Sequence, residues 1–185
     1  MIKLPIINYK PEIDCLRAIA VFLVILFHFE LFMIKGGFVG VDVFFVISGY
    51  LITTILIEDL ENKQFSIIYF YERRMRRILP ALTVVLLISI ILAWIFLNDS
   101  ALNKFAGSVI GVSLFFSNVV FWKQQGYFDD SAELNPLLHT WSLAIEEQYY
   151  LIFPIFLFIA WRFGKSRVFW LIVFLAVISL VLSEW

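Results

Sequence analysis

The sequence predicts an all-α protein built as a polytopic transmembrane helical bundle. Apolar residues make up 62% of the 185 residues, charged residues make up only 16%, and the mean hydropathy is +0.93. Soluble domains lie nearer to half apolar and a quarter charged. The apolar residues also form five or six blocks of transmembrane length, without the one-faced pattern of amphipathic helices. These observations indicate a single transmembrane domain over residues 1–185.

The first two apolar segments are expected to form a hairpin of membrane helices. Residues 1–13 are a short amphiphilic lead-in, and Leu16–Ile34 is long enough to cross a bilayer and lacks a small-residue cleavage site. We therefore expect this segment to remain as the first membrane helix. A tight turn at residues 35–37 leads to the second span, Phe38–Ile57. The glycines of this region are predicted to permit close helix approach: Gly36, Gly37, Gly40 and Gly49.

A polar, basic connection is expected at Glu58–Arg77, ahead of a third span at Ile78–Leu97. Pro80 would lie in the first turn of that span, where its missing N–H costs little. The next apolar segment, Phe105–Trp122, contains glycine, serine and asparagine. Two interpretations of it stay open: a helix that crosses the membrane and lines a cavity, or a re-entrant segment that does not cross.

The charge distribution indicates the orientation. Eight of the fourteen Lys and Arg residues lie near the N-terminus or in the basic connection: Lys3, Lys10, Arg17, Lys63, Arg73, Arg74, Arg76 and Arg77. The positive-inside rule places both regions in the cytoplasm. A re-entrant Phe105–Trp122 keeps Arg162, Lys165 and Arg167 on the same side, so the charges favour the non-crossing interpretation.

A polar loop at Lys123–Leu138 is followed by a helix at Trp141–Trp161 and by a last apolar run at Val168–Trp185. Because that run has no polar tail, we expect a truncated protein or a fragment, with a domain that is incomplete at its C-terminus. The net charge of −1 gives no reason to expect a nucleic-acid partner. The single Cys15 excludes an internal disulfide, and two histidines without clustered carboxylates predict no metal site.

Arg17 and His28 stand out inside the first apolar segment. They are eleven residues apart, which on an α-helix is about three turns, with a residual rotation of about 20° and a rise of about 16.5 Å. Both side chains therefore share one helix face. Ionisable groups at membrane depth are costly and by default mark a functional site. A histidine can also be a hydrogen-bonded packing residue, but the shared face with Arg17 favours a functional role here.

Four stretches in this order carry a family resemblance. They are LRAIAVFLVILFHF at 16–29, GGFVGVDVFFVISGYLIT at 36–53, FYERRMRRILPAL at 70–82 and LLHTWSLAIEEQYYLIFP at 137–154. The chain resembles the acyltransferase family 3 membrane proteins, bacterial O-acyltransferases of surface polysaccharides and lipopolysaccharide O-antigens. The resemblance covers nearly the whole chain. It implies a domain of about ten helices, of which the chain looks like the amino-terminal half.

The resemblance supports a catalytic role for His28. Two routes stay open: His28 as the base that deprotonates an acceptor hydroxyl, or His28 as a covalent carrier of the acyl group. Asp42 is a candidate for orienting the imidazole, and Glu146 is a second supporting carboxylate. Ser48 is predicted to make a helix–helix hydrogen bond, because no nucleophile elbow surrounds it.

The arginines are candidate donor-binding residues. Planar guanidinium groups suit phosphates, so Arg17, Arg74 and Arg77, with Arg73 and Arg76 beside them, are predicted to hold a cytoplasmic acyl-CoA. The alternative is a stop signal that also binds anionic lipid. The candidate acceptor site consists of His139, Trp141 and Glu147. We expect one of the two adjacent glutamates to face the interior, and the other to meet headgroups or solvent together with Gln148.

The predicted function is a multi-pass O-acyltransferase of the bacterial inner membrane. It would transfer an acyl group, which we expect to be acetyl, from acyl-CoA to a hydroxyl of a surface glycan or its lipid-linked precursor. The expected partners are membrane lipids, the donor and the glycan, with no permanently bound cofactor. The oligomeric state stays open. The alternatives are a transporter or channel, which intramembrane charges also mark, and an inactive fragment of the acyltransferase.

Overall fold

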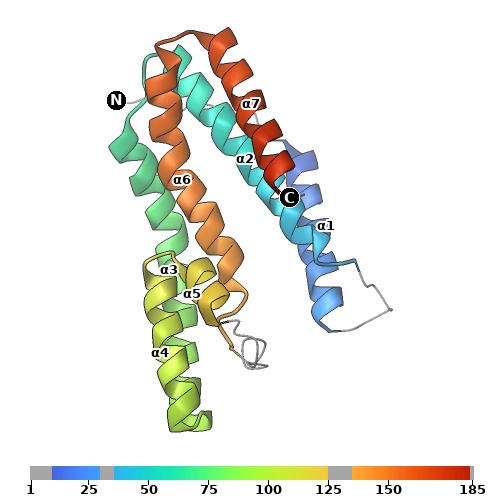
Figure 1. Cartoon of the computed structure of the whole chain (residues 1–185), viewed down its shortest axis with the longest axis vertical. Helices are drawn as coiled ribbons and strands as arrows, with labels where there is room; N and C mark the ends of the chain where they lie inside the picture. The colour runs from blue at the N-terminus through green and yellow to red at the C-terminus, as the bar shows by residue number, and fades with distance from the viewer. Residues whose placement is uncertain (1–9, 30–35, 125–134, 184–185) are drawn as a thin grey trace.

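The computed structural model describes residues 10–29, 36–124 and 135–183. These residues form seven α-helices joined by short links (Figure 1). The helices are α1 Pro11–His28, α2 Val39–Glu61, α3 Ile67–Phe96, α4 Asp99–Ser113, α5 Ser117–Gln124, α6 Thr140–Trp161 and α7 Lys165–Ser183. Over the described ranges there is no strand, so the predicted all-α class is confirmed.

Four of the described helices are long and apolar enough to cross a membrane: α2, α3, α6 and α7. The first predicted span differs from the helix found there. Helix α1 begins at Pro11, where the ring costs no internal hydrogen bond, and therefore starts five residues before the predicted Leu16. Its 18 residues include Glu12, Asp14 and Arg17. The predicted end at Ile34 lies outside the described residues.

Close packing of α1 on α2 depends on two glycines. A Cβ at Gly40 would lie 2.5 Å from the carbonyl oxygen of Ala20, and a Cβ at Gly37 would meet the carbonyl of Leu23. Because glycine has only a hydrogen atom as its side chain, the backbones of α1 and α2 can approach closely at these two positions. Gly36 and Gly49 face open space within the described chain, so the prediction of close approach is wrong for them.

Most of the basic segment ahead of the third span is helical. The prediction of a polar connection from Glu58 to Arg77 is therefore wrong. Helix α2 runs to Glu61 and α3 begins at Ile67, which leaves residues 62–66 as the link. The hydroxyl of Ser66 accepts from the backbone N–H of Tyr69 at 3.4 Å and caps α3. The 30 residues of α3 correspond to about 45 Å against a hydrocarbon core of about 30 Å. Hydropathy therefore marks the apolar part of this helix and misses its start.

Pro80 consequently lies inside α3 and not in its first turn. Its ring nitrogen has no hydrogen to donate to the carbonyl of Arg76, four residues earlier. The usual hydrogen bond between these two residues is therefore missing from α3.

The segment Phe105–Trp122 is not one helix. It is divided between α4 and α5, and the chain turns back at Phe115, whose φ of 55° is left-handed. These helices have 15 and 8 residues, or about 22 and 12 Å, and neither is long enough to cross about 30 Å of hydrocarbon. The interpretation of this segment as a single helix that crosses the membrane is therefore wrong. Helix α4 packs beside α3 and α5 packs against α6, as a short hairpin (Figure 1).

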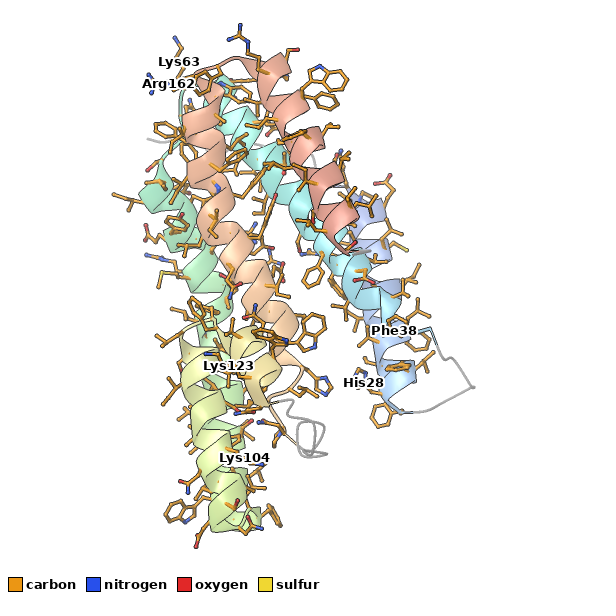
Figure 2. All side chains as sticks on the ribbon, in the orientation of Figure 1. His28, Phe38, Lys63, Lys104, Lys123 and Arg162 are labelled. Carbon is orange, nitrogen blue, oxygen red and sulfur yellow. The ribbon has the colours of Figure 1, made fainter. Side chains whose placement is uncertain are left out.

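Four cations of the described chain mark the two ends of the bundle. Lys63 and Arg162 lie together at one end, while Lys104 and Lys123 lie toward the other, as does His28 (Figure 2). Because Lys63 precedes α3 and Arg162 follows α6, these two helices run in opposite directions.

The last two helices agree closely with the predicted segments. Helix α6 begins one residue before the predicted Trp141 and ends at the predicted Trp161. Helix α7 begins three residues before the predicted Val168, and the last two residues of the chain lie outside the described part. The ammonium group of Lys165 pairs with Glu61 at 2.6 Å and so links the start of α7 to the end of α2.

Two groups of buried side chains hold the described helices together. One joins α2, α3, α6 and α7 and includes Ile52, Leu56, Phe70, Tyr150, Leu157, Ala160 and Val168. The other joins α3 to the α4–α5 hairpin and includes Leu82, Ala93, Phe105, Val112, Phe121 and Leu137. The polar groups of α6 lie where these two apolar groups meet.

Candidate functional site

Glu146 of α6 is the centre of a polar cluster between α2 and α6. Its Oε1 accepts a hydrogen bond from Ser48 Oγ at 2.5 Å and a second from the hydroxyl of Tyr150. Ser48 is buried in α2, so the predicted helix–helix bond of this serine is confirmed. Tyr150 was not a predicted site residue, because one tyrosine among so many aromatic residues gives no signal in the sequence.

Arg74 lies against the same tyrosine from α3. The central carbon of its guanidinium group is 4.5 Å from the centroid of the Tyr150 ring and 5.9 Å from that of Phe70. Tyr150 is the eleventh of the 22 residues of α6, so the charge of Arg74 lies at the midpoint of a helix long enough to span the membrane. A charge at that depth indicates a functional group.

The structure separates Arg74 from the other arginines of its cluster. Arg73 lies 4.8 Å from the ring centroid of Tyr69, and Arg76 forms an ion pair of 2.7 Å with Glu72 on the exposed side of α3. Arg77 is exposed. Arg74 is half-buried and lies against Tyr150 of α6. It is therefore the member of the cluster that faces the candidate site.

A cleft of about 570 Å³ opens between α3, the α4–α5 turn and α6, and we call it the α3–α6 cleft. Its lining residues are Tyr71, Arg74, Met75, Leu114, Phe115, Phe116, Glu147, Gln148, Tyr150, Leu151 and Ile152. The Oε1 atom of Glu147 is buried there without a hydrogen-bond partner in the described chain. Such an atom favours a ligand that donates a hydrogen bond.

Gln148 fixes the hairpin turn to this cleft. Its amide nitrogen donates to the carbonyl of Phe115 at 2.8 Å and to Asn118 Oδ1 at 3.0 Å. The side chains of Glu146, Glu147 and Gln148 are all partly buried, and each of the two glutamates lines a cavity. The contact of one glutamate and Gln148 with headgroups or solvent stays a prediction. Neighbouring helical residues are about 100° apart around the axis, and the two glutamates therefore serve different cavities.

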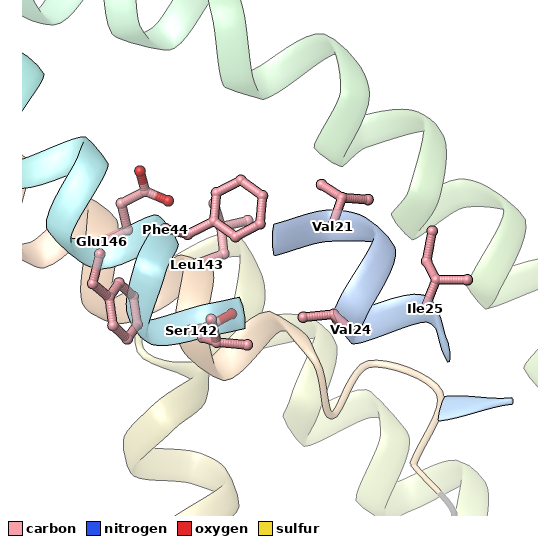
Figure 3. Close-up of a pocket in the computed structure, with 9 residues that line it drawn as sticks. Val21, Val24, Ile25, Phe44, Ser142, Leu143 and Glu146 are labelled. Atoms are coloured by element: carbon pink, nitrogen blue, oxygen red, sulfur yellow. The ribbon is translucent and has the colours of Figure 1, made fainter. Parts of the chain in front are cut away.

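Glu146 lines that second cavity, a pocket of about 310 Å³ that we call the α1–α6 pocket. Its lining residues are Val21, Val24, Ile25, Val41, Phe44, Phe45, Ser142, Leu143 and Glu146 (Figure 3). Ser142 and Glu146 are its polar side chains. Because Tyr150 lines the cleft and Glu146 lines the pocket, the hydrogen bond between them lies at the boundary of the two cavities.

His28 and His139 meet near the other end of the α1–α6 pocket. Their ring centroids are 4.6 Å apart and the ring planes are nearly perpendicular, at 84°. The Nδ1 atom of His28 lies 2.8 Å from the carbonyl oxygen of Val24. A carbonyl only accepts, so Nδ1 is the donor and carries the hydrogen. The lone pair of Nε2 is then free, as a base or a nucleophile requires.

Other predicted site residues lie apart from this pair. Asp42 is exposed, and among the described residues it has no hydrogen bond to His28. Arg17 pairs with Asp14 at 3.7 Å, on a helix that contacts α2 and, within the described chain, does not contact α3. The ring of Trp141 faces Phe45, with 6.4 Å between the ring centroids.

The candidate site therefore consists of two clusters along α6. One contains His28 and His139, and the other contains Ser48, Arg74, Glu146, Glu147 and Tyr150. Glu146 follows His139 by seven positions, which is about 10.5 Å along a helix. The α1–α6 pocket lies between the clusters.

The pair of histidines makes a testable prediction about pH. Burial lowers the pKa of His139 from 6.5, and the facing His28 lowers that pKa further. The unfolded chain then binds this proton more readily, so the contribution of neutral His139 to stability is full above pH 6.5 and is lost as the pH falls through the lowered pKa. We expect His28→Ala to raise the pKa of His139, because it removes a like charge.

An NMR titration of labelled histidines in detergent measures this pKa directly, because the chain has two histidines. His139→Ala assigns the two signals. A His139 that titrates at 6.5 or above in the parent, or that is unmoved by His28→Ala, would contradict the arrangement.

Comparison with known proteins gives a family match over nearly the whole chain. A family model described as "Acyltransferase domain" matches residues 10–185. The chain is 42% identical over 161 residues to the peptidoglycan O-acetyltransferase OatA of Listeria monocytogenes, covering 86% of this chain and 26% of that protein. It is 37% identical over 176 residues to the O-acetyltransferase OatA of Staphylococcus aureus, covering 94% of this chain and 29% of that protein.

An uncharacterized protein of Haemophilus influenzae is 47% identical over 133 residues, covering 71% of this chain and 54% of that protein. The chain thus spans between about a quarter and a half of the lengths of these relatives. No solved structure gives a significant match.

Proposed function

The chain belongs to this acyltransferase family, and on that premise we propose that it forms part of a membrane O-acetyltransferase with a cytoplasmic acetyl-CoA donor and a glycan acceptor. The relative from Listeria monocytogenes, which is named as a peptidoglycan O-acetyltransferase, favours peptidoglycan, or a precursor of it, over lipopolysaccharide as that acceptor. We place the protein in the inner membrane of a bacterium with its N-terminus in the cytoplasm, because Lys10, Lys63 and Arg162 then lie on the cytoplasmic side.

The observation that carries this proposal is the position of Arg74. A half-buried guanidinium at the midpoint of a membrane-spanning helix, beside a cleft of about 570 Å³, suits an anionic ligand that enters the membrane. Acetyl-CoA has phosphate groups that the arginines can bind, and an extended pantetheine arm with amide N–H groups. The unpartnered Oε1 of Glu147 is an acceptor for one of these groups.

The reaction forms a bond between the acetyl carbonyl carbon and the acceptor oxygen and breaks the bond from that carbon to sulfur. If His28 is a base, Nε2 takes the hydroxyl proton as the oxygen attacks, and the thiolate leaves and is protonated. If His28 is a carrier, Nε2 attacks first and the thiolate leaves. The acceptor hydroxyl then attacks the acetyl-imidazolium, Nε2 is released as the leaving group, and the thiolate takes the hydroxyl proton. The tautomer set by Val24 serves both routes.

The acetyl group must also move from the cleft to His28. The distance from Glu146 to the histidine pair is about 10.5 Å along α6, and the α1–α6 pocket bridges most of it. We propose that the thioester end of the donor passes the Glu146–Tyr150 boundary and enters this pocket. Arg17, at the other end of the His28 face, would contact the donor from α1.

Membrane vesicles of opposite orientation test the proposal. Vesicles carrying the longest reading frame that contains this chain receive peptidoglycan fragments on both sides and labelled acetyl-CoA on the outside only. We expect inverted vesicles, which expose the cytoplasmic face, to label the glycan, and right-side-out vesicles not to label it. Vesicles without the protein are the control. Absence of label in both orientations would reject the acetyl-CoA-dependent transfer, and label only in right-side-out vesicles would reject the orientation.

A further inference from the structure

Tyr150 contacts the candidate site with both parts of its side chain. Its ring lies 4.5 Å from the guanidinium carbon of Arg74, and its hydroxyl donates to Oε1 of Glu146. The residue is 4% exposed and belongs to the buried group that joins α2, α3, α6 and α7. Because Arg74 comes from α3, a buried α6 side chain thus links the arginine to the carboxylate.

The ring and the hydroxyl supply different interactions. An aromatic face attracts a cation most strongly when water is excluded, and it also limits the positions of a long, flexible side chain. The hydroxyl instead fixes the orientation of the Glu146 carboxylate, because a hydrogen bond to a charged group is strong and directional. Ser48 reaches the same oxygen from α2 at 2.5 Å.

We propose that Tyr150 is a positioning residue that couples donor binding at Arg74 to the orientation of Glu146. This inference rests on the proposed function. The ring holds Arg74 at the α3–α6 cleft, and the hydroxyl, together with Ser48, holds Glu146 toward the α1–α6 pocket. Loss of the hydroxyl alone and loss of the whole ring should therefore have different kinetic effects.

Tyr150→Phe and Tyr150→Leu separate the two contributions. Tyr150→Phe keeps the ring, so KM for acetyl-CoA should change less than about 3-fold, while kcat falls about 10- to 100-fold because one charge-assisted hydrogen bond is lost. Tyr150→Leu should lower kcat similarly and also raise KM about 10-fold, because Arg74 loses its aromatic partner. Initial rates at graded acetyl-CoA, in membranes with matched protein abundance, give both constants.

Tyr149→Phe is the matched control, since the hydroxyl of this neighbouring tyrosine lies 3.4 Å from Thr53, whereas the donors to Glu146 are Ser48 and Tyr150. It should retain the parent kcat. Ser48→Ala removes the second donor to Oε1, and it should lower kcat with KM unchanged. This variant keeps the test decisive if a Tyr150 variant does not accumulate.

The inference is overturned if Tyr150→Phe or, where that variant does not fold, Ser48→Ala retains the parent kcat. It is also overturned if Tyr150→Phe raises KM as much as Tyr150→Leu does. A parent that transfers no acetyl group would instead reject the proposed function, and this inference with it.

Discussion

Replacing His28 by alanine is expected to lower acetyl transfer to the glycan by about 10²- to 10⁴-fold, the range that a general base contributes. The reason is structural: Val24 holds the hydrogen on Nδ1 and leaves Nε2 with a free lone pair, and alanine supplies no basic atom. The measurement is the transfer of labelled acetyl from acetyl-CoA in membranes with equal amounts of the parent and the variant.

Phe29→Ala is the control for this variant, since Phe29 follows α1 directly and is 70% exposed. It should retain activity. Equal loss of protein and of activity in His28→Ala would indicate a packing histidine and contradict a catalytic role. When the acceptor is left out, protein quenched rapidly in neutral denaturant also distinguishes the two routes. Label that stays on the parent and is missing from His28→Ala indicates a covalent carrier, whereas unlabelled protein indicates a base.

Arg74→Ala is expected to lower kcat/KM for acetyl-CoA by about 10- to 100-fold, mainly through KM, because a charge-assisted contact to the donor is lost. Arg74→Lys should retain only part of the parent kcat/KM for acetyl-CoA. Lysine keeps the charge, but its ammonium group cannot form a planar two-pronged contact and does not stack on the Tyr150 ring as guanidinium does.

Initial rates over a range of acetyl-CoA concentrations measure both effects. Arg162→Ala provides the matched control, because Arg162 is an exposed cation beyond the end of α6. It should have the parent KM. If Arg74→Ala also has the parent KM, Arg74 does not bind the donor. If Arg74→Lys is equivalent to the parent, charge alone matters and the ring contact does not.

The apolar blocks were sufficient to predict the helical class and most of the spans, because hydrophobic length is a property of the local sequence. The start of α3 could not be predicted in the same way. Ser66 caps that helix outside the apolar block, and the arginines that follow are compatible with a helix or a loop. Likewise, the break at Phe115 depends on Gln148, which is 33 residues away.

The candidate site was predictable only in part for a related reason. The Arg17–His28 spacing and the two glutamates are visible along single helices, and His28 was singled out from that spacing. The contact of His28 with His139 and the contact of Arg74 with Tyr150 join different elements of the chain. They depend on how each helix is rotated about its axis, which the hydropathy of a segment does not determine.

The α4–α5 hairpin decides how the rest of the chain is threaded through the bilayer. If Phe105–Trp122 is counted as one more crossing, the number of crossings before α6 increases by one. Every later loop is then assigned to the opposite side of the membrane. Because the hairpin returns to the side from which it came, α6 follows α3 as the next passage in the opposite direction. The side-chain amide of Gln148 and the Phe115 carbonyl, 2.8 Å apart, thus help to keep Arg162, Lys165 and Arg167 in the same compartment as Lys63.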